Sequence, residues 1–223
     1  LDSASPVPDM GFIDRWSHKT AASAPCASVT TTETLNGLSV LAATLASFAL
    51  VRPAPAAPPP VFEGPGVLSS IGQSSDIAVV KVLLNTKLKL GLDVKPLAQP
   101  ADLAGQKSLV VVVGASTKGL GAAGLDVARE TERAKALLEA ARAKGIGVIA
   151  LHTGGGSRRG KTTDDLVKLV VPLSDYVVVV AGGNKDKSFQ AAAGARPVPI
   201  VEVESLAAVG DAVKAVFRET RAP

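Results

Sequence analysis

The sequence predicts an α/β fold: a single three-layer open parallel sheet of five to six strands, flavodoxin-like or Rossmann-like, preceded by a signal segment. From Val61 onward, apolar runs of strand length alternate with helical stretches, which is typical of strand–helix–strand units. The valine runs 110–113 and 177–180, in a chain with 3% aromatic residues, indicate β-branched strands that are buried on both faces. An uncharged run at 35–51 predicts the signal segment.

This uncharged run decides the predicted domain organisation. It has 17 residues, and Ala54 and Ala56 follow it with the spacing of a signal-peptide cleavage site. A retained membrane anchor is the alternative, since about 17 apolar residues is near the shortest length that spans a bilayer. In both cases the domain is expected to be extracytoplasmic, either periplasmic or secreted. The predicted parts are an unstructured or spurious leader (1–34), the signal h-region and cleavage site (35–57), a proline-rich spacer (58–65) and the α/β domain (66–220).

The first half of the domain is predicted from apolar runs and the residues that cap them. A strand at 66–71 is followed by Ser74 and Ser75, and either serine can cap a helix at 76–89. The next strand, 92–97, is separated from the strand at 109–113 by so few residues that the crossover holds little more than one helical turn, at 102–105.

The second half begins with a long loop at 114–126. Its 13 residues exceed the usual two to six of a strand–helix loop, and long ordered loops are usually functional. The helix after it carries Glu130 and Arg133 among many charged residues, all of which are expected on a solvated outer face. The remaining elements are predicted as helix 127–144, strand 147–152, loop 153–163, helix 164–171, strand 176–181, helix 185–193, strand 199–203 and helix 206–218.

A ligand site is predicted where the strands of this sheet end. If the strands lie in the order 2-1-3-4-5 with the sixth at the edge, the loops after the first and third strands face each other across a crevice. Glycines let the backbone approach a ligand, and hydroxyl, amide and cationic groups donate hydrogen bonds to an anion. The predicted ligand-binding residues are Gln73, Ser74, Ser116, Lys118, Gly119, Gly121, Arg158, Arg159 and Asn184.

Two stretches of the sequence match the residue patterns of known nucleotide-binding motifs. Gly155-x-x-x-x-Gly160-Lys161-Thr162 has the pattern of a phosphate-binding loop between a strand and a helix. The loop follows the fourth strand, however, and no later strand ends in an acidic residue that could hold magnesium, so a triphosphatase is the less favoured interpretation. Gly119-x-Gly121-x-x-Gly124 matches a dinucleotide fingerprint, but it lies deep in a loop rather than directly after a strand.

Residues suited to catalysis are few. His152, the single histidine after the signal segment, ends a strand and is a candidate general base, with Asp126 as its candidate partner. No Gly-x-Ser-x-Gly elbow is present, and a histidine that only caps neighbouring loops is an equal alternative. A non-catalytic domain that binds a small anionic or polyhydroxylated ligand is therefore favoured, and an extracytoplasmic hydrolase or transferase that uses His152 is the alternative.

Composition excludes several other partners. The net charge is +4, but basic and acidic residues are interspersed, and no basic run or set of aromatic residues favours nucleic-acid binding. The single cysteine and the absence of a Cys/His cluster predict neither an internal disulfide nor a metal site. No cofactor is predicted, a membrane is expected to be a partner only through an uncleaved signal segment, and a protein partner is not indicated.

Three strings together resemble a known family. They are the residues 70–76 (SIGQSSD), 112–126 (VVGASTKGLGAAGLD) and 154–160 (GGGSRRG). They are similar to those of an uncharacterised family of exported bacterial α/β domains, classed only as a domain of unknown function, over roughly Val61 to Phe217. This resemblance implies export and an α/β fold, and it implies no activity or substrate.

Overall fold

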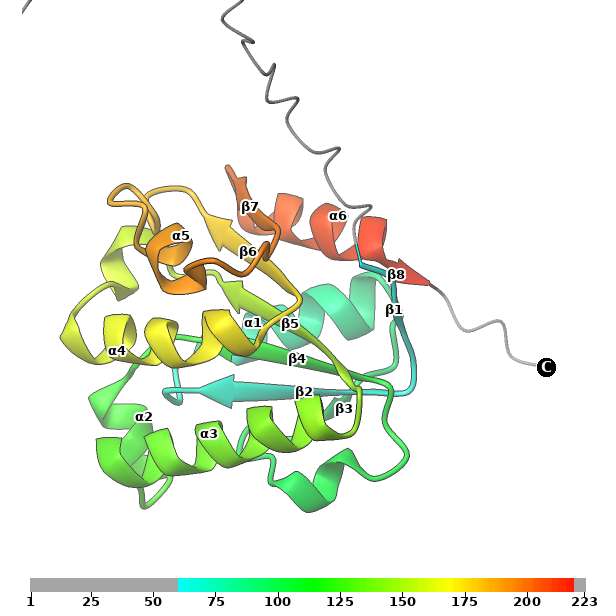
Figure 1. Ribbon diagram of the computed structural model, residues 1–223, viewed down its shortest axis with the longest axis horizontal. Helices are drawn as coiled ribbons and strands as arrows, with labels where there is room; N and C mark the ends of the chain where they lie inside the picture. The colour runs from blue at the N-terminus through cyan, green and yellow to red at the C-terminus, as the bar shows by residue number, and fades with distance from the viewer. Residues whose placement is uncertain (1–59, 219–223) are drawn as a thin grey trace, which may run out of the picture. The chain divides into compact units, whose positions relative to one another are not determined.

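Six parallel strands form one sheet in the computed structural model, which describes residues 60–218 (Figure 1). The order across the sheet is β3-β2-β4-β5-β6-β7, so the predicted strand order and fold class are confirmed. The leader predicted at 1–34 and the signal segment predicted at 35–57 lie outside the described residues. The strands are β2 (Gly66–Ile71), β3 (Asp93–Val94), β4 (Ser108–Val113), β5 (Gly147–His152), β6 (Tyr176–Val180) and β7 (Ile200–Val203).

Helices cover both faces of this sheet, as Figure 1 shows. On one face α3 (Val127–Ala143), α4 (Lys161–Val170) and α5 (Ser188–Ala193) pack against alternate strand residues such as Val111 and Val177. On the other face α1 (Asp76–Lys81), its π-helical continuation η1 (Val82–Lys87) and α6 (Leu206–Val216) cover Val110 and Val178. Because the central strands are buried on both sides, their sequences read as continuous valine runs. Shorter helical turns are η2 (Pro100–Leu103), α2 (Thr117–Ala122), η3 (Gly155–Arg158) and η4 (Val171–Leu173).

A second, two-stranded parallel sheet joins the beginning and the end of the described chain. It pairs β1 (Phe62–Glu63) with β8 (Phe217–Arg218), and both phenylalanines are buried. The spacer predicted at 58–65 is therefore corrected, since Phe62 belongs to the core. The helix predicted at 206–218 ends at Val216, because the next two residues enter β8.

Two further boundaries differ from the prediction. The strand expected at 92–97 is reduced to the two residues of β3, since Pro96 has no N–H group with which to continue the ladder. The loop expected at 114–126 contains the helix α2, which Ser116 caps.

The parallel strands all begin at one end of the sheet and all finish at the other end. The carboxyl edge is the end at which the strands finish, and the amino edge is the end at which they begin. The chain order reverses between β2 and β4, whose last residues, Ile71 and Val113, are register partners. The loops after β2, β4, β5 and β6 all leave from the carboxyl edge, as predicted, and this reversal marks the switch point at which α/β sheets commonly bind ligands.

Candidate functional site

The two loops at the switch point are paired with one another rather than held apart. The Ser116 N–H group donates to the Gly72 carbonyl at 2.8 Å, and Gln73 and Ala115 form an isolated antiparallel bridge. A Cβ atom at Gly119 would lie 1.9 Å from the carbonyl oxygen of Gln73, so only glycine fits at this contact. The crevice predicted between these two loops is therefore closed by the backbone itself.

Several residues predicted to bind a ligand instead hold these loops together. The Ser116 hydroxyl caps α2 by accepting from the Gly119 N–H group at 3.1 Å. The Ser74 hydroxyl is buried and accepts from the Asp76 N–H group at 3.3 Å. Lys118 and Gly121 are exposed on α2. The prediction that these residues contact a ligand stays untested, but the serine hydroxyls and Gly119 have structural roles.

Gln73 is held by a buried ion pair beneath it. Its backbone has a positive φ of 55°, and its side-chain amide donates to Glu130 Oε1 at 3.1 Å. The same oxygen accepts from the Gly72 N–H group at 2.7 Å. Arg133 donates to both carboxylate oxygens of Glu130, at 2.8 and 2.9 Å, and also to the Ala98 carbonyl. The turn after β2 is thus fixed by a fully buried carboxylate whose hydrogen bonds are satisfied.

This ion pair corrects the expectation that the charges of α3 all face solvent. Glu130 is 1% exposed and Arg133 is 7% exposed. A signal was present in the sequence, because Glu130 lies four, seven and eleven residues before buried positions of the same helix, which is the spacing of a helix's core-facing stripe. The buried positions that share this stripe are Ala134, Leu137 and Ala141.

An open hollow does exist at the carboxyl edge, one loop further along the sheet. It has a volume of about 240 Å³ and lies between the loop after β4 and the loop that joins β5 to α4. The first turn of α4 lines it, and Gly160 at the N-cap has no side chain to accept from the N–H groups of that turn. The lining residues of this carboxyl-edge hollow are Ala115, Thr117 and residues 157–163. The structure therefore brings the segments around Lys118 and Arg158 together, as predicted.

Arg158 connects the carboxyl-edge hollow to the switch point. Its guanidinium lies 3.3 Å from the Ser75 hydroxyl and 3.5 Å from the Asp76 carboxylate, and its side chain is 34% exposed. Gly154 makes this position possible, because a Cβ atom there would lie 1.9 Å from Arg158 Cγ. These two contacts are long, so most of the five guanidinium donors stay available to a ligand.

Among the buried side-chain oxygens that have no hydrogen-bond partner within the described residues, two follow the ends of β2 and β5. They are Asp76 Oδ2 and Thr153 Oγ1. The Asp76 oxygen lies 3.0 Å from the position of a Cβ on Gly154 and 3.7 Å from that of a Cβ on Gly114, where the loops after three strands meet. A buried acceptor without a donor costs about 1–3 kcal/mol, so a ligand group that donates to Asp76 Oδ2 would stabilise the protein. Asp76 was not among the predicted site residues, since an Asp in the first turn of a helix usually serves only the helix dipole.

Arg159 was predicted to bind the ligand, but its donors are already occupied. It donates to Asp164 at 2.6 Å and to both carboxylate oxygens of Asp186 at 3.0 Å. It also donates to the Gly183 carbonyl and lies 5.8 Å from the centre of the Phe189 ring. Hydrogen bonds donated to Asp186 and Asp164 raise the pKa of Arg159, and the same pairing holds the pKa of Asp186 well below its usual range. Arg159 therefore fastens the loop after β6 to α4.

Asn184 was also predicted to bind the ligand and is instead a buried structural residue. Its amide donates to Gln190 at 2.7 Å and to Glu202 at 2.9 Å, and its carbonyl accepts from the Phe189 N–H group. Hydrogen bonds from Lys187 and then from Asn184 lower the pKa of Glu202. At 1% exposure Asn184 has no face open to a ligand.

The two candidate catalytic residues are engaged separately. His152 is 1% exposed, and its Nδ1 and Nε2 atoms lie 3.0 and 3.1 Å from the carbonyl oxygens of Val113 and Gly155. Asp126 is the N-cap of α3 and accepts from the Arg129 N–H group at 2.8 Å. His152 thus contacts two backbone carbonyls and Asp126 caps a helix, and neither residue hydrogen-bonds to the other.

The segment that matches the phosphate-binding loop motif contains a short helix and an exposed lysine. The residues from Gly155 to Arg158 form the short helix η3, and the Gly155 carbonyl faces His152. Lys161 is 92% exposed and pairs with Asp165 at 2.7 Å across one turn of α4. Its ammonium group therefore points along the helix surface rather than over the loop.

Within residues 60–218, no three His, Cys, Asp or Glu side chains lie close enough together to hold a metal ion. None of the helices in that range combines the length and the apolar character that a membrane span requires.

Comparison with known proteins adds a family and no activity. No curated protein matches the chain. The model of a domain of unknown function, DUF6305, matches residues 63–217, which are more than two thirds of the chain. The resemblance to an uncharacterised family is thereby confirmed, and the matched residues begin and end in the β1–β8 pair that closes the domain. The chain belongs to the DUF6305 family of domains of unknown function.

Proposed function

We propose that this domain is an exported, non-catalytic binder of a small polar ligand, and that the ligand occupies the carboxyl-edge hollow at Arg158 and reaches from there to Asp76, the carboxylate beside that arginine. The observation that carries the proposal is the buried Asp76 Oδ2 atom, which has no donor within the described residues. A ligand hydroxyl or ammonium group would supply that donor and remove the free-energy cost of the orphan oxygen.

The other half of the ligand is an anion. Arg158 sits at the mouth of the hollow with two long contacts, and the first turn of α4 contributes N–H groups beside it. A guanidinium and a helix N-terminus both favour a carboxylate or a phosphate. The ligand class is therefore a small molecule with an anionic group and a hydroxyl or amino group a few ångströms apart, such as a hydroxy acid, an amino acid or a sugar acid.

The position of His152 supports a binder over a hydrolase or transferase. A general base must reach the proton that it abstracts, and both ring nitrogens of His152 face backbone carbonyls inside the protein. The surface position of Lys161 in the same way offers little support for a nucleotide triphosphatase.

A thermal-shift screen against hydroxy acids, amino acids, sugar acids and sugar phosphates tests the proposal. A ligand at about 100 times its Kd stabilises the native state by about 2.7 kcal/mol, which raises the Tm by several degrees. Asp76→Asn and Arg158→Ala should each abolish this shift, whereas Arg129→Ala, an exposed arginine on α3, should retain it. Asp76→Asn should leave the Tm without ligand within about 2 °C, because the amide replaces an oxygen that has no partner.

Three outcomes would contradict the proposal. The first is a panel in which no compound shifts the Tm, and the second is a shift that both variants retain. The third is turnover of a hit compound that is lost in His152→Asn, which would establish the enzyme instead. Export is tested separately, since mass spectrometry of the secreted protein should find an N-terminus near Ala57, and an intact segment 38–50 in soluble cytosol would refute it.

A further inference from the structure

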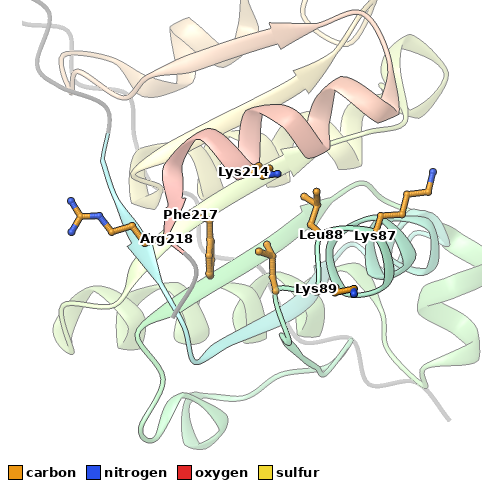
Figure 2. A pocket seen from close by; sticks show the side chains of 7 residues that line it. Lys87, Leu88, Lys89, Lys214, Phe217 and Arg218 are labelled. Carbon is orange, nitrogen blue, oxygen red and sulfur yellow. The ribbon is translucent and has the colours of Figure 1, made fainter. Parts of the chain in front are cut away.

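A second hollow, of about 380 Å³, lies at the amino edge, on the opposite end of the strands from the proposed ligand site (Figure 2). It is formed where η1 ends, where α6 ends and where β8 begins. Four of its seven lining residues are cationic and none is acidic. The residues that line this amino-edge hollow are Lys87, Leu88, Lys89, Leu90, Lys214, Phe217 and Arg218.

None of these four cations forms an ion pair with a carboxylate in the part of the chain that the structure describes. Glu63 is the register partner of Arg218 in the β1–β8 pair, but its carboxylate pairs with Lys107 at 3.3 Å. The positive charge of the amino-edge hollow is therefore concentrated and uncompensated within residues 60–218.

The negative ends of helix dipoles offset only part of this positive charge. Two helices end at the hollow, and each helix end carries the equivalent of about half a negative charge. Two helix ends thus balance about one of the four cations, and about three positive charges remain.

Lys89 occupies a backbone conformation that favours glycine. Its φ is +56°, in the left-handed region, which costs a residue with a side chain about 1–2 kcal/mol. Glycine would end the helix at this position without that cost. A lysine at such a position is therefore a candidate for a role that needs its charge.

The arrangement of the side chains favours a broad anionic surface over a single enclosed ligand. Figure 2 shows Arg218 on one side of the hollow and Lys87 on the other, pointing away from each other, with Phe217 and Leu88 between them. Cations at the rim of an apolar centre suit the phosphates of a lipid bilayer. The chain enters β1 next to this hollow, since β1 pairs with β8, which contributes Phe217 and Arg218 to its lining.

We infer that the amino-edge hollow docks the domain onto an anionic phospholipid surface through Lys87, Lys89, Lys214 and Arg218. Docking by this edge leaves the carboxyl-edge hollow, with Asp76 and Arg158, on the far end of the strands and open to solution.

Vesicle binding of the full chain tests this inference. Because residues 35–51 could hold the chain to any bilayer, the measured quantity is the partition onto phosphatidylglycerol-containing vesicles relative to pure phosphatidylcholine vesicles. The wild-type chain should prefer the anionic vesicles, and 1 M salt should remove the preference. The variant K87Q/K89Q/K214Q/R218Q should lose roughly fivefold in relative partition for each cation removed.

A charge-matched control distinguishes a specific edge from net charge. The variant R129Q/K135Q/K168Q/K185Q removes four cations from other exposed positions and should retain most of the preference for anionic vesicles. Equal loss in both variants, or equal wild-type binding to both kinds of vesicle, would overturn the inference. Loss of the anionic preference on addition of millimolar inorganic phosphate at constant ionic strength would also overturn it, in favour of a site for a free phosphate.

Discussion

The two edges of the sheet differ in what their charged groups already contact. At the carboxyl edge, Arg159 is held by two aspartates, Lys161 by Asp165 and Lys187 by Glu202. At the amino edge, the four cations of the hollow have no carboxylate partner within residues 60–218. These carboxyl-edge cations are thus paired within the protein, whereas the cations of the amino-edge hollow are not.

This difference shows that topology determines which residues meet, whereas ion pairing determines which of them remain free to bind a partner. A parallel sheet gathers the loops of several strands at its carboxyl edge, so residues distant in sequence meet there and pair with one another. A ligand can use only the donors and acceptors that this pairing leaves over, which at the carboxyl edge include Arg158 and the orphan oxygen of Asp76. At the amino edge Lys107 pairs with Glu63, and Arg142 and Arg196 pair with Asp175, whereas the four cations of the amino-edge hollow have no such partner within residues 60–218 and are left for an external one.

The largest expected effect comes from removing the carboxylate that organises the carboxyl edge. Glu130→Ala would leave the Arg133 guanidinium buried without its partner and should destabilise the protein by about 3–5 kcal/mol, measured by denaturant unfolding. Amide exchange at Gly72 and Gln73, which Glu130 holds, should accelerate in the same variant. Glu139→Ala is the control on the same helix, since its pair with Lys135 is exposed and 3.8 Å long, and it should cost less than about 0.5 kcal/mol.

A double variant sharpens this prediction. Replacing Glu130 and Arg133 together by Leu and Met removes both buried charges and should recover much of the lost stability. A Glu130→Ala variant as stable as the wild type would mean that the turn at Gln73 is held by the backbone pairing with Ala115 alone.

Much of the fold could be predicted because it depends on local patterns. The continuous valine runs of β4 and β6 identify strands buried on both faces. The β1–β8 pair could not be predicted, since two strands of two residues each carry no period, and the pair joins positions 155 residues apart.

The meeting of the loops at the carboxyl edge was predictable, but the contacts of each residue there were not. Arg158 and Arg159 are adjacent and chemically identical in the sequence, yet Arg159 meets Asp186 and Arg158 meets Asp76, a residue 82 positions earlier. Which of the two keeps free donors depends on these long-range partners, and no single-sequence pattern reports them. Glu130 is the exception, because the spacing of the apolar residues of α3 in the sequence already places it on the buried face of that helix.

The next largest effect is the difference in stability between variants of Arg159 and Arg158. Arg159→Leu should destabilise the protein by about 2 kcal/mol, because it removes charge-assisted hydrogen bonds to Asp164 and Asp186 and leaves the two carboxylates facing each other. Arg158→Ala should cost less than about 1 kcal/mol, since its contacts are long and partly exposed. Thermal unfolding of both variants measures the difference. Equal losses would show that the carboxyl edge uses both arginines structurally and would remove Arg158 as a free donor.

The smallest expected effect lies at the amino edge and has the opposite sign. Lys89→Gly relieves a left-handed conformation that costs about 1–2 kcal/mol, and the added freedom of glycine in the unfolded chain returns about 0.5–1 kcal/mol of that gain. The variant should therefore be more stable than the wild type by about 0.5–1 kcal/mol in denaturant unfolding. Lys87→Gly, within the last turn of η1, should instead lose about 0.5–1 kcal/mol. If Lys89→Gly gains stability and binds anionic vesicles more weakly, the strain at Lys89 serves the charge of the amino edge. If it loses stability, the left-handed lysine is supported by contacts of its own, and its conformation is no argument for docking.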